Sequence, residues 1–128
     1  MNKKCFVEMP FEKRFDGIWK NVIKPTVEGC GDICLRVDDL FSIGSILKDI
    51  FTSISEADYI IADLTLPNPN VYYELGYSHA LMKKVIIITQ DIHTLPFDLK
   101  HERAIVYSDT AAGAAELGNS LRMYIDNI

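Results

Sequence analysis

Two acidic residues, Asp63 and Glu74, lie in a pattern that could bring their carboxylates together. Asp63 ends a short apolar, β-branched run, Tyr59 to Ala62, which predicts a strand buried on both faces. Glu74 falls in the first or second turn of a helix that Asn68 can cap and Pro69 can begin. A strand of an α/β sheet ends at a ligand crevice, so we expect both carboxylates to point toward one crevice. Paired carboxylates can divide nucleophilic and proton-transfer roles, which makes this a candidate active site.

Amide and hydroxyl groups lie on the loop and helix between these acids. The side chains of Asn68 and Asn70 can donate or accept hydrogen bonds around a ligand. Tyr72 and Tyr73 offer hydroxyls near the crevice, and we expect one of the two rings to pack instead. Gly76 favours a functional interpretation of this helix, because a glycine there would let the helix approach the sheet closely.

Candidate ligand contacts also follow the first two predicted strands. Phe11, in the loop after the first strand, could stack on a base or only cover the end of the sheet. Asp39 follows the second strand, where it could bind sugar hydroxyls or act only as a turn acid. Ser42, Gly44 and Ser45 precede a helix whose free N–H groups favour a phosphate, although such residues also serve as plain caps.

Structural interpretations compete with the functional ones. Glu74 could merely complement the positive end of the helix dipole, and Asp63 could merely bond backbone N–H groups of its loop. His79 lies on an apolar stripe of the same helix, so we expect it to be packed rather than catalytic. The two acids therefore remain the only strong candidates for chemistry.

Strands and helices alternate along the chain, which predicts one α/β domain over residues 1–128. The expected fold is a flavodoxin-like, doubly wound sheet of five parallel strands in the order 2-1-3-4-5, with helices on both faces. At its switch point, between strands one and three, the loop Met9 to Glu12 meets the loop Asp63 to Asn70. Met9, at the start of the first of these loops, is therefore also a candidate substrate contact. The predicted strands are residues 5–9, 33–37, 59–62, 85–89 and 104–107. Helices are predicted over residues 15–28, around 46–54, from Pro69 up to 82, and around 117–128. Pro25 is expected to kink the first helix or to end it early. Residues 90–103 are predicted to form a loop.

Composition excludes several classes of function. A net charge of −5 opposes nonspecific binding to nucleic-acid polymers or anionic membranes. The three cysteines lack metal-binding spacing, which favours free thiols in a reducing compartment. With neither a membrane-spanning run nor a signal peptide, the expected location is the cytoplasm. Dinucleotide, Walker, serine-hydrolase and metal motifs are absent from the sequence, so we predict neither a cofactor nor a metal.

The sequence over residues 57–82 resembles one known group of enzymes. Its Ala57-Asp58, Ala62-Asp63 and Tyr73-Glu74-Leu75-Gly76-Tyr77 segments are similar to those of the nucleoside 2-deoxyribosyltransferase-like superfamily. That superfamily includes deoxynucleoside-monophosphate N-glycosidases and, more distantly, TIR-type NAD glycohydrolases. The resemblance runs from Phe6 to about Tyr107 and implies cleavage or transfer at the N-glycosidic bond of a small nucleoside, nucleotide or NAD.

The resemblance also implies roles for individual residues. Glu74 matches the nucleophile or electrostatic partner of the ribosyl carbon, Asp63 the acid that handles base or sugar, and Phe11 the aromatic near the base. Breaking the bond builds positive charge on the sugar, which a carboxylate beneath C1′ traps or stabilises. Members often complete the site with a neighbouring subunit, so we expect a homo-oligomer. The closing helix and the loop Leu95 to Asp98 are the candidate contacts.

Two alternatives remain open at the level of the sequence. The substrate could be NAD, as in TIR-like signalling proteins, with the same bond chemistry. The loop Leu66 to Asn70 differs from the smaller-residue loops of transferases, and it favours a nucleotide-sensing module without turnover.

Overall fold

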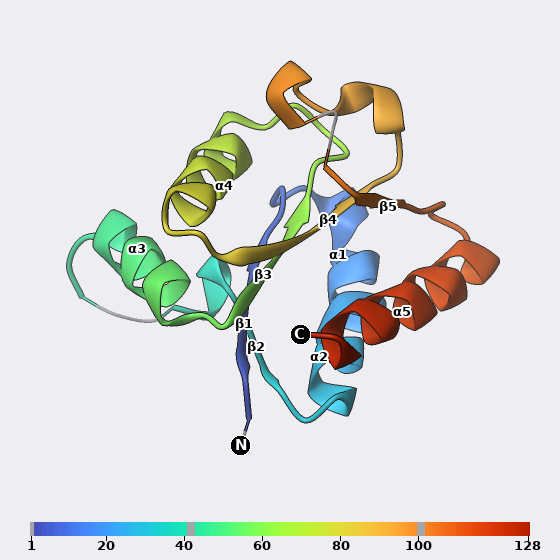
Figure 1. Cartoon of the computed structure of the whole chain (residues 1–128), viewed down its shortest axis with the longest axis horizontal. Coiled ribbons are helices and arrows are strands. Elements are labelled where there is room, and N and C mark those ends of the chain that lie inside the picture. The colour runs from blue at the N-terminus through green and yellow to red at the C-terminus, as the bar shows by residue number, and fades with distance from the viewer. Residues whose placement is uncertain (1, 41–42, 100–101) are drawn as a thin grey trace.

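Five parallel strands form the sheet at the centre of the computed structural model, which describes residues 2–40, 43–99 and 102–128 (Figure 1). Their order is β2-β1-β3-β4-β5, which confirms the flavodoxin-like topology predicted above. The strands are β1 (Lys4–Glu8), β2 (Ile33–Arg36), β3 (Tyr59–Asp63), β4 (Lys84–Thr89) and β5 (Ala104–Val106). Because all five run in the same direction, their carboxyl ends meet at one edge, where a ligand site is expected.

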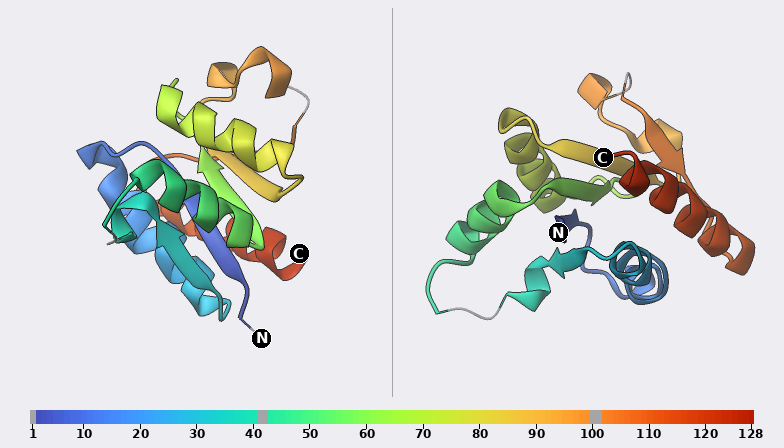
Figure 2. Two further views of the ribbon diagram at one scale, coloured as in Figure 1. Left: turned by 90° about the vertical axis from the view of Figure 1, so that its left-hand side faces the viewer. Right: turned by 60° about the horizontal axis from the view of Figure 1, so that its bottom comes forward.

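Helices cover both faces of this sheet (Figure 2). α3 (Ile46–Glu56) and α4 (Pro69–Ala80) lie on one face and contact each other. α1 (Asp16–Ile18), α2 (Lys24–Gly29) and α5 (Ala111–Asp126) lie on the other face, where α2 contacts α5. None of the described helices is both long and apolar enough to cross a membrane.

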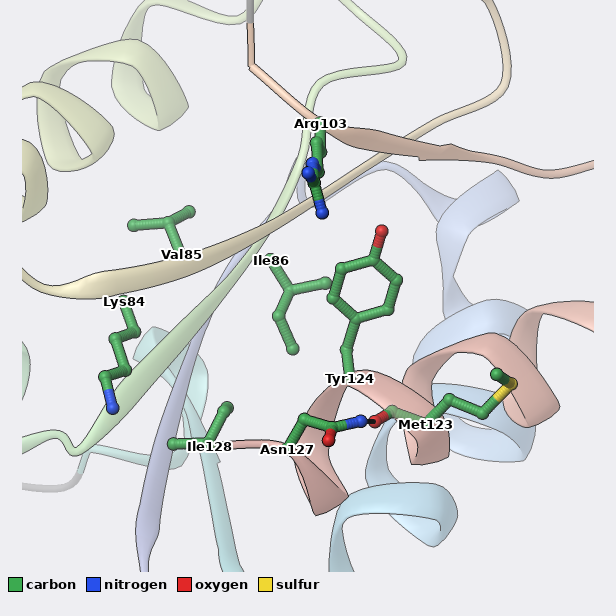
Figure 3. A pocket seen from close by; sticks show the side chains of 8 residues that line it. All are labelled: Lys84, Val85, Ile86, Arg103, Met123, Tyr124, Asn127 and Ile128. Atoms are coloured by element: carbon green, nitrogen blue, oxygen red, sulfur yellow. Dashed lines mark hydrogen bonds between the residues drawn. The ribbon is translucent and has the colours of Figure 1, made fainter.

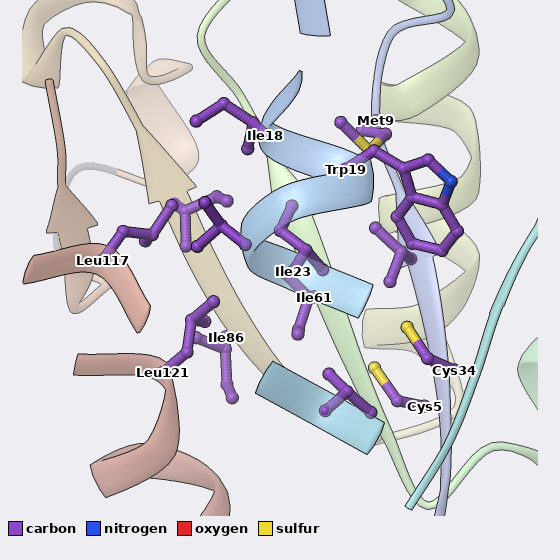
Figure 4. Packing of buried hydrophobic residues seen from close by; sticks show 14 of the residues in the cluster. Cys5, Met9, Ile18, Trp19, Ile23, Cys34, Ile61, Ile86, Leu117 and Leu121 are labelled. Carbon is purple, nitrogen blue, oxygen red and sulfur yellow. The ribbon is translucent and has the colours of Figure 1, made fainter. Parts of the chain in front are cut away.

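β3 is the strand that this arrangement encloses most completely. All its residues from Tyr59 to Asp63 are buried, as the apolar run predicts. Alternate side chains of the strand enter different clusters: Tyr59 and Ile61 pack toward α1, α2 and α5, whereas Ile60 and Ala62 pack toward α3 and α4. The first of these clusters is the largest and joins β1, β3 and β4 to the helices of that face (Figure 4).

The helical segment before β2 runs through a proline. The sequence predicts a kink or an early end at Pro25, but helical turns continue to Gly29, so the early end is wrong. A single π-helical turn, Trp19–Ile23, separates α1 from α2 and precedes the proline. Pro25 is the second residue of α2, a position whose backbone N–H has no partner within that helix in any case.

Element ends differ from the predicted ones by a residue or two at the strands. β2 stops at Arg36, because Val37–Asp39 form a 3-10 turn, and β5 stops at Val106. α5 begins at Ala111, well before the apolar stripe that predicts it, because Thr110 caps the helix through its hydroxyl. The loop after β4 contains two 3-10 turns, Ile92–Thr94 and Phe97–Leu99.

Gly76 does not have the role that the sequence suggests. It lies exposed on α4, and a Cβ built there would meet no described atom within 4 Å outside the helix's own backbone. The expected close approach of helix to sheet at this residue is therefore wrong.

An exposed glycine inside a helix lowers stability through the entropy of the unfolded chain. We expect Gly76→Ala to raise the free energy of unfolding by about 0.5–1 kcal/mol, measured by urea denaturation. A loss of stability would show that the folded protein does not tolerate a methyl group at this position, which would contradict the open space around Gly76.

Candidate active site

Glu74 lines a cavity of about 320 Å³ at the carboxyl edge of the sheet. Its side chain is half-buried, and burial raises its pKa from 4.5 to about 7. No described residue donates a hydrogen bond to its carboxylate or forms an ion pair with it. The carboxylate is therefore partly desolvated, has no partner in the part of the chain that the structure describes, and lies next to open space. These are the properties of a group that interacts with a ligand.

The start of α4 fixes the position of this residue. The Asn68 side-chain oxygen accepts hydrogen bonds from the backbone N–H groups of Asn70, at 2.9 Å, and Val71, at 3.1 Å. Pro69 is the first residue of the helix, so the predicted cap and the predicted start are both confirmed. Val71 and Leu75 are buried against β3 and β4, which turns the neighbouring Glu74 toward the gap between α4 and α3.

Four segments form the walls of the cavity. Asn70 and Tyr73 lie beside Glu74 on α4, and Phe11 comes from the loop after β1. The turn after β2 and α3 form an apolar side. Its residues are Val37, Ile46, Leu47 and Ile50. Sequence reasoning found the polar lining residues but missed this wall, since its residues looked like the ordinary core face of an amphipathic helix.

Arg36, the last residue of β2, packs its guanidinium against the Phe11 ring. The guanidinium carbon lies 5.1 Å from the Phe11 ring centre and 4.7 Å from that of Trp19. Asp38 holds the same guanidinium by two hydrogen bonds, of 2.8 and 2.5 Å, and these lower the pKa of Asp38. A buried cation between two rings fixes Phe11 at the mouth of the cavity, although the ring is 58% exposed.

Asp63 is placed away from this cavity. Its Oδ1 accepts hydrogen bonds from the backbone N–H of Thr65, at 2.9 Å, and from the Thr65 hydroxyl, at 2.6 Å. Its Oδ2 accepts one from the Tyr107 hydroxyl at 2.5 Å. The carboxylate is fully buried, and burial raises its pKa against these hydrogen bonds. Its contacts are those of a group that joins β3 to the loop after it and to Tyr107, and its role at the base stays a prediction.

Some of the other predicted ligand contacts line the cavity, and the rest make structural contacts elsewhere. Ser45 caps α3 by accepting a hydrogen bond from the Lys48 backbone N–H, at 3.3 Å, and Asp39 accepts one from the Arg36 backbone N–H, at 2.9 Å. Met9 is buried in the cluster that packs toward α1, α2 and α5, on the face of the sheet opposite to α4. Met9, Asp39, Ser45 and Asn68 are all outside the cavity lining, and Ser42 lies outside the described residues. Tyr73 lines the cavity while Tyr72 packs in the core, as expected for one ring of the pair.

Glu8 is a buried acid that sequence reasoning missed. It ends β1 with no exposed surface, and its Oε2 lies 2.6 Å from the hydroxyl of Ser78, one turn beyond Glu74 on α4. Its pKa is raised from 4.5 to about 8, chiefly by burial and less by the charge of Glu74, against the lowering effect of the contact with Ser78. The available signal was an acid inside an otherwise apolar strand, Cys5 to Met9.

A larger cavity, of about 470 Å³, lies where β4 and β5 begin (Figure 3). Figure 3 shows the Tyr124 ring and the Arg103 guanidinium directed into the same space, with Lys84 at one side. None of its lining residues is acidic, so it lacks the carboxylate chemistry of the Glu74 site despite its size.

Comparisons with known proteins show the fold of the chain. No family model matches it, and no curated protein matches it significantly. Among solved structures, the Clostridium botulinum CMP N-glycosidase BcmB superposes with a TM-score of 0.74 at 19% identity, covering 95% of this chain and 99% of that one. The 2-deoxyribosyltransferase of Bacillus psychrosaccharolyticus superposes with a TM-score of 0.65 at 16% identity, covering 93% and 90%. The chain therefore has the nucleoside 2-deoxyribosyltransferase-like fold over nearly its whole length.

Proposed function

We propose that the protein cleaves or transfers the N-glycosidic bond of a nucleoside or nucleotide, with Glu74 acting at the anomeric carbon. The observation that carries this proposal is the half-buried Glu74 carboxylate, which has no partner among the described residues and lies beside a cavity of about 320 Å³. Structures of the same fold, titled as an N-glycosidase and a 2-deoxyribosyltransferase, support the same class of chemistry.

Glu74 supplies the negative charge that this chemistry needs. As the bond between C1′ and the base nitrogen breaks, its electrons leave with the base and positive charge grows on the sugar. A carboxylate beneath C1′ bonds to that carbon or stabilises it through the field of a poorly solvated charge. With a pKa of about 7, Glu74 is partly ionised at neutral pH, and more so as pH rises. The departing base takes a proton from solvent. Water or a second base then attacks C1′ and gives up a proton to solvent, and the Glu74 carboxylate is restored.

The remaining lining residues suit a nucleoside. The exposed Phe11 ring offers a stacking surface for a base, and the Asn70 amide offers hydrogen bonds to sugar hydroxyls. Ile46 and Leu47, the first residues of α3, place the positive end of that helix dipole at the cavity wall. A 5′-phosphate would be favoured there, which makes nucleoside monophosphates the first substrates to test.

Release of free base tests the proposal. The protein is incubated with nucleosides, nucleoside monophosphates and NAD, and the products are separated by chromatography. Base release from a nucleoside or monophosphate is the expected result, and nicotinamide release from NAD alone would move the substrate to the TIR-like class. Ligand-induced thermal stabilisation with no product over hours would contradict turnover and favour a sensing module.

Phe11 gives a prediction about binding. Phe11→Ala should raise KM about tenfold with little change in kcat, because base stacking contributes about 1–3 kcal/mol and is made before the bond breaks. Steady-state kinetics measure both constants. Met123→Ala, which removes an exposed side chain from the other cavity, is the matched control. A fall in kcat at unchanged KM would place Phe11 at the reacting bond instead.

A further inference from the structure

Glu8 and Glu74 are joined through one serine. The Ser78 hydroxyl lies 2.6 Å from Glu8 Oε2 and 3.0 Å from the backbone carbonyl oxygen of Glu74. Ser78 is itself fully buried, and the other oxygen of Glu8, Oε1, is buried with no hydrogen-bond partner among the described residues. A buried carboxyl group thus lies directly beneath the helix turn that carries the candidate nucleophile.

The number of hydrogens available to these contacts indicates the protonation state of Glu8. A hydroxyl has one hydrogen, so an ionised Glu8 and the Glu74 carbonyl would compete for the single proton of Ser78. If Glu8 carries a proton on Oε2, that proton goes to the Ser78 oxygen and the Ser78 proton goes to the carbonyl. Both contacts are then complete, and the unpartnered Oε1 belongs to a neutral group, which costs far less than an unpartnered buried charge.

We propose that Glu8 is a positioning residue of the Glu74 site, a buried carboxylic acid that must stay protonated for α4 to hold Glu74 in place. This inference rests on the proposed function for its kinetic consequence but not for its structural one. The two acids ionise in order: Glu74 first, and Glu8 second because it then faces an existing charge.

The other charged groups on the strands beside β1 interact with partners other than Glu8. Arg36, on β2, bonds Asp38 through two of its nitrogens, and its third, Nη1, is buried with no partner among the described residues. Asp63, on β3, accepts hydrogen bonds from Tyr107 and Thr65. The negative charge of Glu74 acts on Glu8 and raises its pKa, which favours retention of the Glu8 proton. None of the described residues supplies Glu8 with a paired cation, so ionisation of Glu8 would require α4 and Ser78 to move and admit water.

The first arm of the test needs no substrate. Carboxyl carbon NMR, assigned with Glu8→Gln, should show Glu8 titrating near pH 8, and the midpoint should fall in Glu74→Gln because the neighbouring charge is gone. The free energy of unfolding should decline between about pH 4.5 and 8, since the raised pKa stabilises the fold only while Glu8 is protonated. Glu8→Gln should remove the part of this decline that Glu8 causes and leave the part caused by Glu74, whose pKa is raised to about 7. Titration of Glu8 below about pH 5 would overturn the proposal.

The second arm uses base release. For the intact protein, kcat/KM should rise through pH 7 as Glu74 ionises and fall about tenfold per unit above pH 8 as Glu8 ionises. Glu8→Gln should lose only the alkaline fall, whereas Glu28→Gln, an exposed acid on α2, should keep both limbs. An alkaline fall that persists in Glu8→Gln would overturn the kinetic role. If no substrate is cleaved, the proposed function fails, and the NMR arm still decides the state of Glu8.

Discussion

Replacing Glu74 by glutamine should lower kcat/KM for base release by about 10³-fold or more. The amide keeps the size of the side chain and removes its negative charge. Its effect therefore reports the interaction with the positively charged sugar rather than a loss of packing. Chromatographic quantification of released base, at a pH above 7 where Glu74 is ionised, measures the effect.

A control acid separates the site from general effects of charge. Glu56→Gln changes the net charge equally at an exposed position at the end of α3 and should retain the activity of the unchanged protein. Activity of Glu74→Gln within about tenfold of the unchanged protein would remove Glu74 from the mechanism, since one lost electrostatic contact of this kind costs at least 10²-fold.

Removing the Asp63 carboxylate should have the largest effect on stability. Asp63→Ala leaves the Thr65 backbone N–H, the Thr65 hydroxyl and the Tyr107 hydroxyl without their common acceptor in a buried position. Unsatisfied buried groups cost about 1–3 kcal/mol each, so we expect a loss of about 3 kcal/mol or more in urea denaturation.

A second variant distinguishes structure from catalysis at this residue. Asp63→Asn keeps an oxygen for Thr65, and the Tyr107 hydroxyl can accept from its amide, so much of the stability should return. If Asp63 only supports the fold, Asp63→Asn should also recover most of the base-releasing activity. A stable Asp63→Asn protein with activity reduced 10²-fold or more would instead support the role at the base that the resemblance implies.

Local signals made the fold predictable. The apolar run at β3, the Asn68-Pro69 helix start and the alternation of strands and helices each depend on nearby residues, and the structure agrees with all three. The turn Val37–Asp39 was less predictable, because the hydrogen bond from the Arg36 N–H to the Asp39 carboxylate competes with continuation of β2.

The direction of Asp63 could not be predicted from the sequence. A strand buried on both faces has no alternation of apolar and polar residues, so nothing in the run Tyr59 to Ala62 marks which face each side chain meets. In the structure Asp63 shares the face of Tyr59 and Ile61 and bonds Tyr107, while Glu74 belongs to the helix on the opposite face. The two acids are near in sequence and separated by the sheet.

Glu8 was hidden for a related reason. Neighbouring apolar residues made β1 look like an ordinary core strand, and the partner that makes its acid interpretable, Ser78, is far away in the sequence. Only the three-dimensional arrangement places Glu8, Ser78 and Glu74 in one chain of contacts.

The most direct test is a crystal structure of the Glu74→Gln variant soaked with a nucleoside monophosphate. We expect the ligand in the cavity between α3 and α4, its base against Phe11 and its C1′ within about 3–3.5 Å of the side-chain oxygen at position 74. A nucleotide bound instead in the cavity beside Tyr124, or with its sugar turned away from α4, would contradict the proposed role of Glu74.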